Sequence, residues 1–108
     1  MSRTELVPGT LILLVLRVLQ AGPLHGYAIA QRISVVSGEV LRVEEGSLYP
    51  ALHRMEEAGW IRATWITKDT GRRARTYELT TAGKKQLATE ESRWQSVTTA
   101  VNRVLRTV

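Results

Sequence analysis

The sequence has no cysteine, only one aspartate and only two histidines, His25 and His53. Without cysteine, the chain can form neither a disulfide bridge nor a thiolate metal site. It also lacks a nucleophile elbow, a glycine-rich phosphate loop and the histidine spacing of a metal site. We therefore expect a protein that is not an enzyme and that uses no cofactor or metal ion.

Long apolar runs are also missing. The longest comprises residues 11–16 and continues past Arg17 to Leu19, whereas a membrane-spanning helix needs ~20 apolar residues. The sequence that follows at residues 22–26, GPLHG, is typical of a turn and not of a signal-peptide cleavage site. We expect a cytoplasmic protein with no membrane partner.

The chain has 108 residues, enough for one domain with a single core. Lysine and arginine number 15 against 10 aspartate and glutamate residues, which gives a net charge of +5. Arginine, whose guanidinium suits phosphate and guanine, supplies 12 of the 15 cations. Such a balance is common among nucleic-acid-binding proteins, but ribosomal and membrane-surface proteins share it, so it is a weak indicator by itself.

Apolar periodicity and helix-capping residues predict four helices. They cover about residues 10–21, 25–37 and 46–58, and a last helix begins at a cap on Thr80 or Thr81 and runs to the end of the chain. Thr10 is the expected N-cap of the first helix, and residues 39–43 are expected to form a short strand or an extended loop. The side chains available for burial in the second helix are Tyr27, Ile29, Ile33 and Val36.

After Gly59 the apolar period changes to two, which predicts a β-hairpin with a polar turn at residues 68–73. The side chains that share a face within each strand are Ile61, Ala63 and Trp65 in the first, and Tyr77 and Leu79 in the second. This order of elements indicates a mainly α protein with a small β-hairpin (α+β). We expect a winged helix-turn-helix DNA-binding domain in residues 1–80 and a C-terminal dimerisation helix in residues 81–108.

The hairpin is the most basic part of the sequence. It carries one anion, Asp69, and five cations: Arg62, Lys68, Arg72, Arg73 and Arg75. Crowded cations repel one another, and binding to a polyanion would relieve this repulsion and release counterions. We therefore expect DNA contacts from the cations of the turn and second strand, Lys68, Arg72, Arg73 and Arg75; the alternative is a solvated basic turn.

The third helix is a candidate recognition helix. Leu48, Leu52 and Met55 stand at i, i+4 and i+7 and form its buried stripe. The residues expected on its outward side, where they suit phosphates and major-groove base edges, are Ser47, Tyr49, Pro50, His53 and Arg54. An ordinary polar helix face is the alternative. Because Glu56 and Glu57 lie near its end, the N-terminal half is the half expected to face DNA.

The last helix carries an apolar seam with heptad-like spacing. Its members are Leu87, Trp94, Val97, Val101, Val104 and Val108. The seam is longer than a small core needs, and the first helix is apolar on every side, so both features predict a homodimer. Two copies of Trp94 across the dimer axis could sandwich a small aromatic or cationic effector; the alternative is that Trp94 fills space between the last helix and the first.

Four segments together resemble the PadR family of bacterial transcription regulators, and in particular its short subfamily with a single C-terminal dimerisation helix. They are residues 24–29 (LHGYAI), 46–52 (GSLYPAL), 59–61 (GWI) and 72–80 (RRARTYELT), followed by Gly83. The resemblance implies a winged-helix homodimer that represses promoters and responds to small aromatic or cationic compounds. It also implies that residues 47–54 belong to the recognition helix and residues 68–75 to the wing.

These inferences predict a sequence-specific DNA-binding regulator, acting as a repressor. A two-fold dimer would bind an inverted-repeat operator in double-stranded DNA, and a small-molecule effector would release it. The alternative is a winged helix that serves only as a protein–protein interaction module. Such a module would interact weakly with DNA, with little dependence on salt, and it would leave the basic hairpin unexplained.

Overall fold

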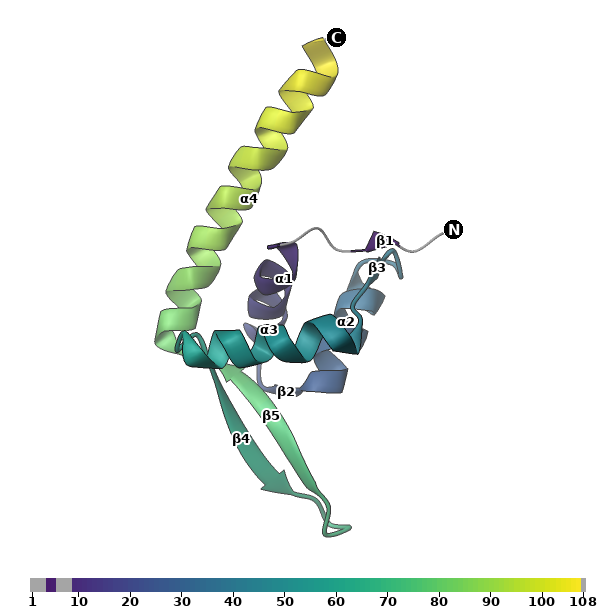
Figure 1. The fold of residues 1–108 in the computed structure, drawn as a ribbon, viewed down its shortest axis with the longest axis vertical. Coiled ribbons are helices and arrows are strands. Elements are labelled where there is room, and N and C mark those ends of the chain that lie inside the picture. Colours follow the sequence, from purple (N-terminus) through teal and green to yellow (C-terminus); the bar gives the residue numbers. More distant parts are fainter. Residues whose placement is uncertain (1–3, 6–8, 108) are drawn as a thin grey trace.

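The computed structural model describes residues 4–5 and 9–107, which form helices, a three-stranded antiparallel sheet and a short parallel strand pair (Figure 1). In chain order the elements are β1 (Thr4–Glu5), α1 (Thr10–Leu19), β2 (Leu24–His25), α2 (Gly26–Val36), β3 (Leu41–Arg42), α3 (Glu45–Glu57), β4 (Ile61–Thr67), β5 (Arg73–Leu79) and α4 (Thr81–Thr107). The predicted α+β class, with a hairpin between the third and the last helix, is confirmed.

The core lies where α1, α2 and α3 meet, because each of these helices buries an apolar stripe there. In α3 the predicted stripe of Leu48, Leu52 and Met55 is confirmed, since all three side chains are fully buried. Ile61 and Tyr77 extend the core from the sheet, and Leu87 extends it from α4. The core therefore joins the three helices to the base of the hairpin and to the beginning of the last helix.

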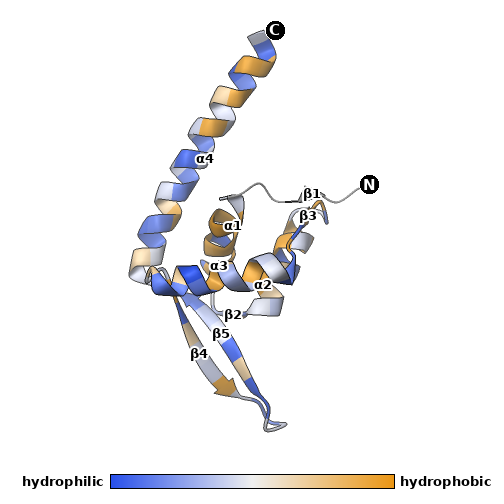
Figure 2. Cartoon of the chain, in the orientation of Figure 1, coloured by the Kyte–Doolittle hydropathy of each residue, from blue (hydrophilic) through white to orange (hydrophobic). Residues whose placement is uncertain are grey.

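The helix α1 is apolar over most of its surface, and Figure 2 shows it largely in orange, although it includes the exposed Arg17. Its N-cap is Gly9, so the cap expected at Thr10 lies one residue earlier. One side of α1 is buried in the core, whereas its remaining apolar side chains are only partly covered: Leu11, Ile12, Leu14 and Val18. This partial cover matches the expectation that α1 needs more apolar surface than one domain supplies.

In α2 the expected burial is right for two residues and wrong for two. Ile29 and Ile33 are buried, whereas Tyr27 is 67% and Val36 is 73% exposed. Tyr27 stands two positions before Ile29, which is about 200° around a helix, so its side chain points away from the core. Val36 is the last residue of α2 and lies at its exposed end.

The sheet has the strand order β2-β5-β4, with antiparallel pairing throughout. Ile61 pairs with Leu79 at the base of the hairpin and Thr67 with Arg73 near its tip, which confirms the predicted hairpin. Burial decreases along the strands because the hairpin leaves the body of the domain (Figure 1). Ile61 is buried, Ala63 is half-buried, and Trp65 on the same face is exposed.

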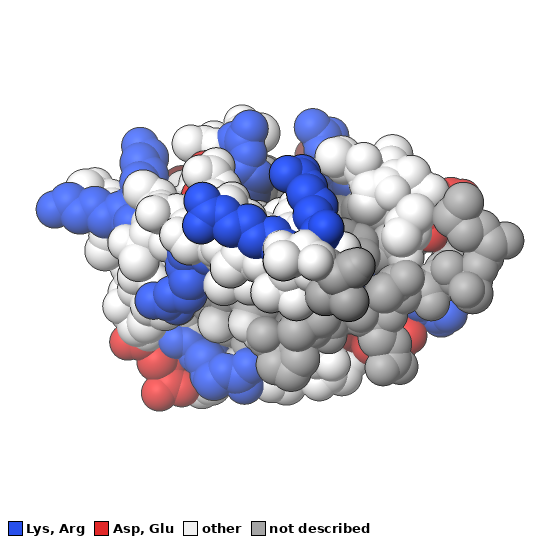
Figure 3. Space-filling view, turned by 90° about the horizontal axis from the view of Figure 1, so that it is seen from above, with Lys and Arg blue, Asp and Glu red and all other residues white. Residues whose placement is uncertain are grey.

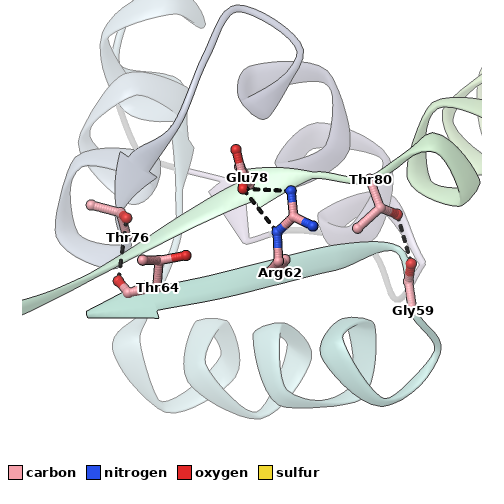
Figure 4. A network of polar contacts seen from close by, with 6 residues as sticks. All are labelled: Gly59, Arg62, Thr64, Thr76, Glu78 and Thr80. Atoms are coloured by element: carbon pink, nitrogen blue, oxygen red, sulfur yellow. Dashed lines mark hydrogen bonds and ion pairs between the residues drawn. The ribbon is translucent and has the colours of Figure 1, made fainter. Parts of the chain in front are cut away.

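The helix α4 begins at the base of the hairpin, where Thr80 caps it. Thr80 Oγ1 accepts a hydrogen bond from the Gly83 N–H (3.0 Å) and donates one to the Gly59 carbonyl (2.6 Å; Figure 4). Of the two expected caps, Thr80 is therefore the one that forms. Leu87 packs in the core, but the rest of α4 projects from the domain (Figure 1). The hairpin projects in the other direction, and the molecule is 60 Å long along this axis. Within residues 4–5 and 9–107, no helix combines the length and apolarity needed to cross a membrane.

Candidate nucleic-acid interface

The outward face of α3 carries the five side chains expected to contact DNA. Ser47, Tyr49, Pro50, His53 and Arg54 are all exposed on this helix. Because an α-helix has 3.6 residues per turn, Ser47 and Arg54 follow one edge of the face, and Tyr49 and His53 follow the other. The structure thus brings the predicted recognition residues together on one solvent-facing surface.

Two of these side chains differ in their partners. His53 Nε2 lies 2.8 Å from Glu57 Oε1, one helical turn further along α3, and both side chains are well exposed. Arg54 has no carboxylate within ion-pair distance among the described residues. The His53 imidazole therefore contacts a carboxylate of its own helix, whereas the Arg54 guanidinium remains available to an anion.

Tyr49 has a second role that the sequence did not indicate. Its ring lies directly on the backbone of Gly26, because a Cβ atom added to Gly26 would come within 2.9 Å of Tyr49 Cε1. The side chain is nevertheless partly exposed. Tyr49 thus sets the spacing between α2 and α3 with one side of its ring and presents the other side to solvent.

The wing, defined here as β4, β5 and the turn between them, does not carry five equivalent cations. Arg62 is paired with Glu78, whose Oε1 lies 2.9 Å from Nε and 2.7 Å from Nη2 (Figure 4). Arg75 is paired with Glu56 of α3, at 2.8 Å between Nη2 and Oε2. Two of the five cations are therefore neutralised within the protein, and Arg75 is occupied by a contact inside its own chain.

The unpaired basic charge collects at the tip of the wing. Among the described residues, no carboxylate lies within ion-pair distance of Lys68, Arg72 or Arg73. Hydrogen bonds from the Lys68 N–H to the Arg72 carbonyl and from the Gly71 N–H to the Lys68 carbonyl, both 2.8 Å, close the turn. Gly71 has a φ of 83°, a left-handed conformation that glycine adopts without steric cost. The turn therefore holds three cations close together with little to neutralise them.

Sequence reasoning missed two residues of this region. Trp65 was assigned only to a strand face, yet its ring lies beside the guanidinium groups of Arg73 and Arg75. Glu56 was assigned only to the end of α3, yet it holds Arg75. The alternation of arginines two residues apart, opposite a tryptophan in a hairpin, was the available signal for the first of these contacts.

The predicted dimer seam is mostly unburied in the single chain. Leu87 belongs to the core, whereas Trp94, Val97, Val101 and Val104 are exposed, and Val108 lies outside the described residues. Figure 2 shows the apolar turns recurring along the projecting part of α4. Exposed valines at this spacing form a contiguous apolar stripe, which is typical of a surface that another helix covers.

Trp94 is 47% exposed and stands where α4 passes α1. It lines two open hollows, one shared with Leu13 and Val97 and the other with Leu14 and Arg17. One side of the indole therefore borders the side chains of α1, and the remainder is accessible. The residue has both the packing neighbours of a space-filling side chain and the open surface of a candidate ligand contact.

Basic charge is not confined to the wing. Seen from the end of the molecule at which α4 terminates, lysine and arginine cover more of the surface than aspartate and glutamate do (Figure 3). In the second half of α4, Arg103 and Arg106 follow the last acidic residue of the sequence, Glu91. The overall charge therefore does not locate the interface. The cations without carboxylate partners among the described residues, on α3 and at the tip of the wing, are the more specific indication.

The sequence model of the Transcriptional regulator PadR-like family matches residues 15–89. A PadR family transcriptional regulator from Eggerthella lenta is 28% identical and has a TM-score of 0.81, over 93% of this chain and 85% of that one. A transcriptional regulator from Clostridium thermocellum is 26% identical and has a TM-score of 0.82, over 88% of this chain and 92% of that one. An uncharacterised 37.1 kDa transposon protein from Streptomyces fradiae is 45% identical over 78 residues, which are 72% of this chain and 21% of that protein.

The matched region begins in α1 and ends within α4. It thus contains α2, the exposed face of α3 and the whole wing, which are the elements that make up the candidate interface. The likeness to the two solved structures covers 88% and 93% of this chain. The chain belongs to the PadR-like family of transcriptional regulators, and its fold is the winged helix-turn-helix of that family.

Proposed function

We propose that this protein is a transcriptional repressor that binds an inverted-repeat operator as a homodimer. The observation that carries the proposal is the exposed face of α3 next to a wing whose tip holds Lys68, Arg72 and Arg73 without acidic partners among the described residues. A helix of this kind fits the major groove, and flanking cations neutralise phosphates. A surface used only for protein contacts has no need of such a charge distribution.

In the proposed complex, α3 lies in the major groove with its N-terminal half foremost. Arg54 is the side chain best suited to guanine, and His53, Tyr49, Ser47 and Pro50 complete the surface that faces base edges and phosphates. The three cations at the tip of the wing contact the flanking phosphates or the adjacent minor groove. We assign DNA binding to residues 1–80.

Residues 81–108 form the proposed dimerisation helix. A second copy of α4 would cover Trp94 and the exposed valines of the seam, together with the partly covered side of α1. The first turns of this helix also pack on the DNA-binding domain, because Leu87 lies in its core. A two-fold dimer places two copies of α3 on one face of DNA, so its half-sites are centred about 10 base pairs apart.

Release of the operator by an effector is a further part of the proposal. Trp94 and the open hollow of about 330 Å³ beside it are the place where a flat aromatic or cationic compound could bind. Trp94 as a space-filling residue is the alternative. Titrating the protein with flat cationic dyes, and comparing it with a Trp94→Ala protein that is still a dimer, distinguishes the two, because saturable fluorescence quenching lost in the variant supports the site.

Selection of bound fragments from genomic DNA with the purified protein tests the proposed function. We expect enriched fragments to share an inverted repeat. Arg54→Ala or His53→Ala should then reduce discrimination between this repeat and random DNA by about 1–3 kcal/mol, whereas Arg103→Ala in the distal part of α4 should leave it unchanged. Failure to enrich any common sequence would contradict the proposal.

A further inference from the structure

The wing carries an exposed tryptophan that packing of the core does not explain. Trp65 lies on the same strand face as the buried Ile61, but it is 54% exposed because the hairpin has left the domain at that point. An indole in such a place leaves a large apolar ring in water. The role of Trp65 must therefore come from the residues that it contacts and not from burial in the core.

Its neighbours are two arginines of the opposite strand. Arg75 is paired directly with Trp65 in the antiparallel register, and Arg73 is two residues away on the same face. The Cζ atom of Arg73 lies 4.9 Å from the centre of the Trp65 ring, and that of Arg75 lies 5.7 Å from it. Both distances are within the range of cation–π attraction. Arg72 precedes β5, and among the described residues the only cations within this range of the Trp65 ring are Arg73 and Arg75.

The two arginines differ in what else holds them. Arg75 is paired with Glu56, whose side chain is only 23% exposed, and its Cζ atom also lies 5.6 Å from the ring centre of the buried Tyr77. Among the described residues, Arg73 has Trp65 as its single charge or ring partner. Arg75 is thus fixed between α3, the core and Trp65, whereas Arg73 rests on the indole with no carboxylate competing for it.

A planar guanidinium stacked on an indole keeps its N–H edge free for phosphates or groove atoms. A long side chain that is already ordered loses less conformational freedom when it binds. We propose that Trp65 is a positioning residue that holds Arg73 ready for DNA, and that Arg75 and Glu56 brace this stack against α3. The inference rests on the proposed function and assigns the DNA contact on this face of the wing to Arg73, with Arg75 as a brace.

Binding to the selected operator, measured at several salt concentrations, tests the stack through two matched substitutions. Trp65→Leu keeps an apolar side chain without a ring, and Trp65→Phe keeps a ring. We expect Trp65→Leu to weaken binding about 3- to 10-fold, through the lost ordering of one long side chain, with the salt slope unchanged because no charge is removed. Trp65→Phe should stay within about 2-fold of the unsubstituted protein, and Arg73→Ala should lower the salt slope by about one.

Double substitutions show whether Trp65 acts through Arg73. In an Arg73→Ala protein, Trp65→Leu should have no further effect, because the side chain that it positions is gone. In the matched Arg72→Ala protein, Trp65→Leu should retain its full effect, since the cation contacts of the Trp65 ring found among the described residues are with Arg73 and Arg75 and not with Arg72. Equal effects of Trp65→Leu in both backgrounds would overturn the inference, and so would a Trp65→Leu protein that binds as well as the unsubstituted one.

A measurement without DNA separates this inference from the proposed function. The δ protons of Arg73 should show an upfield ring-current shift in the NMR spectrum of the free protein, kept in Trp65→Phe and lost in Trp65→Leu. Absence of this shift in a protein that binds its operator overturns the stack and leaves the proposed function intact. Presence of the shift in a protein that selects no DNA sequence refutes the proposed function, and with it the DNA role of Arg73, while the stack itself stands.

Discussion

At the scale of single residues, Gly83 has the least room for a side chain among the described glycines. It lies in the first turn of α4, where its N–H donates a hydrogen bond to Oγ1 of the capping Thr80. A Cβ atom at this position would overlap the carbonyl oxygen of Trp60 and come within 2.8 Å of Leu79 Cδ1. The absence of a side chain therefore allows α4 to start directly against the base of the hairpin.

Gly83→Ala should destabilise the protein by at least about 2 kcal/mol, because a backbone carbonyl cannot move aside as a flexible side chain can. Gly46→Ala is the matched control, since a Cβ atom there meets nothing within 4 Å. In the helix α3 this control should be neutral or stabilise by about 0.5–1 kcal/mol. Urea unfolding at one protein concentration measures both, and equal stabilities would show that the close approach at Gly83 is absent.

Tyr77 gives the protein a dependence on alkaline pH. Burial raises the pKa of the Tyr77 phenol above its ordinary value of about 10, and the neighbouring Arg75 guanidinium only partly offsets this. Tyr77 then ionises at lower pH in the unfolded chain than in the folded one. Its contribution to stability is complete below pH ~10 and is lost as the pH rises through the folded-state pKa.

Tyr77→Phe removes this ionisation and keeps the ring in the core. We expect the free energy of unfolding of the variant to fall less steeply above pH ~10 than that of the unsubstituted protein. Urea unfolding at several pH values on either side of this point makes the comparison. Parallel curves for the two proteins would mean that Tyr77 ionises equally easily in the folded and unfolded states.

At the scale of secondary-structure elements, the long helices and the extended segment at residues 39–43, which contains β3, could be predicted from the sequence, whereas β2 could not. The stripe of Leu48, Leu52 and Met55 predicted α3 to within one residue at each end. β2, by contrast, has two residues and exists because it pairs with Tyr77 and Thr76 of β5. A two-residue strand has no period of its own, and its partner is far away in the sequence, so only the folded chain reveals it.

The same limit applies to the candidate interface. The exposure of Ser47, Tyr49 and Arg54 could be predicted because helical periodicity fixes which side of α3 is buried. The pairing of Arg75 with Glu56 could not, since it depends on how the hairpin leans against α3. In the sequence, Arg75 looks equivalent to the cations of the tip. Only the tertiary contact with Glu56 shows that it is paired and that they, among the described residues, are not.

The wing should bind DNA mainly through the cations at its tip. Replacing Arg72 and Arg73 together by alanine should weaken binding to all DNA sequences alike and lower the salt slope by about one to two. Arg62→Ala is the control, because Arg62 is already neutralised by Glu78 and should leave the slope nearly unchanged. Fluorescence anisotropy on operator and random duplexes supplies both slopes, and an unaltered slope in the double variant would reduce the wing to a solvated turn.

At the scale of the whole molecule, the projecting part of α4 exposes an apolar stripe that a single chain does not cover. Replacing Val97 and Val101 by glutamate should place unpaired charges in the proposed dimer interface, cost several kcal/mol and yield monomer or unfolded chain. Ser92→Glu with Thr99→Glu adds the same charge to the opposite side of α4 and should preserve the dimer. Sedimentation velocity decides between them: a folded, intact dimer of the valine variant would place the interface elsewhere.

In the proposed complex, two copies of this chain recognise a DNA sequence through α3 and the wing. The most direct test is the affinity of the purified protein for its selected inverted repeat and for a scrambled duplex of equal composition, over a range of salt concentrations. We expect at least about thousandfold tighter binding to the repeat, with both affinities falling as salt increases. Equal affinities for the two duplexes, or binding that salt does not weaken, would contradict the proposed complex.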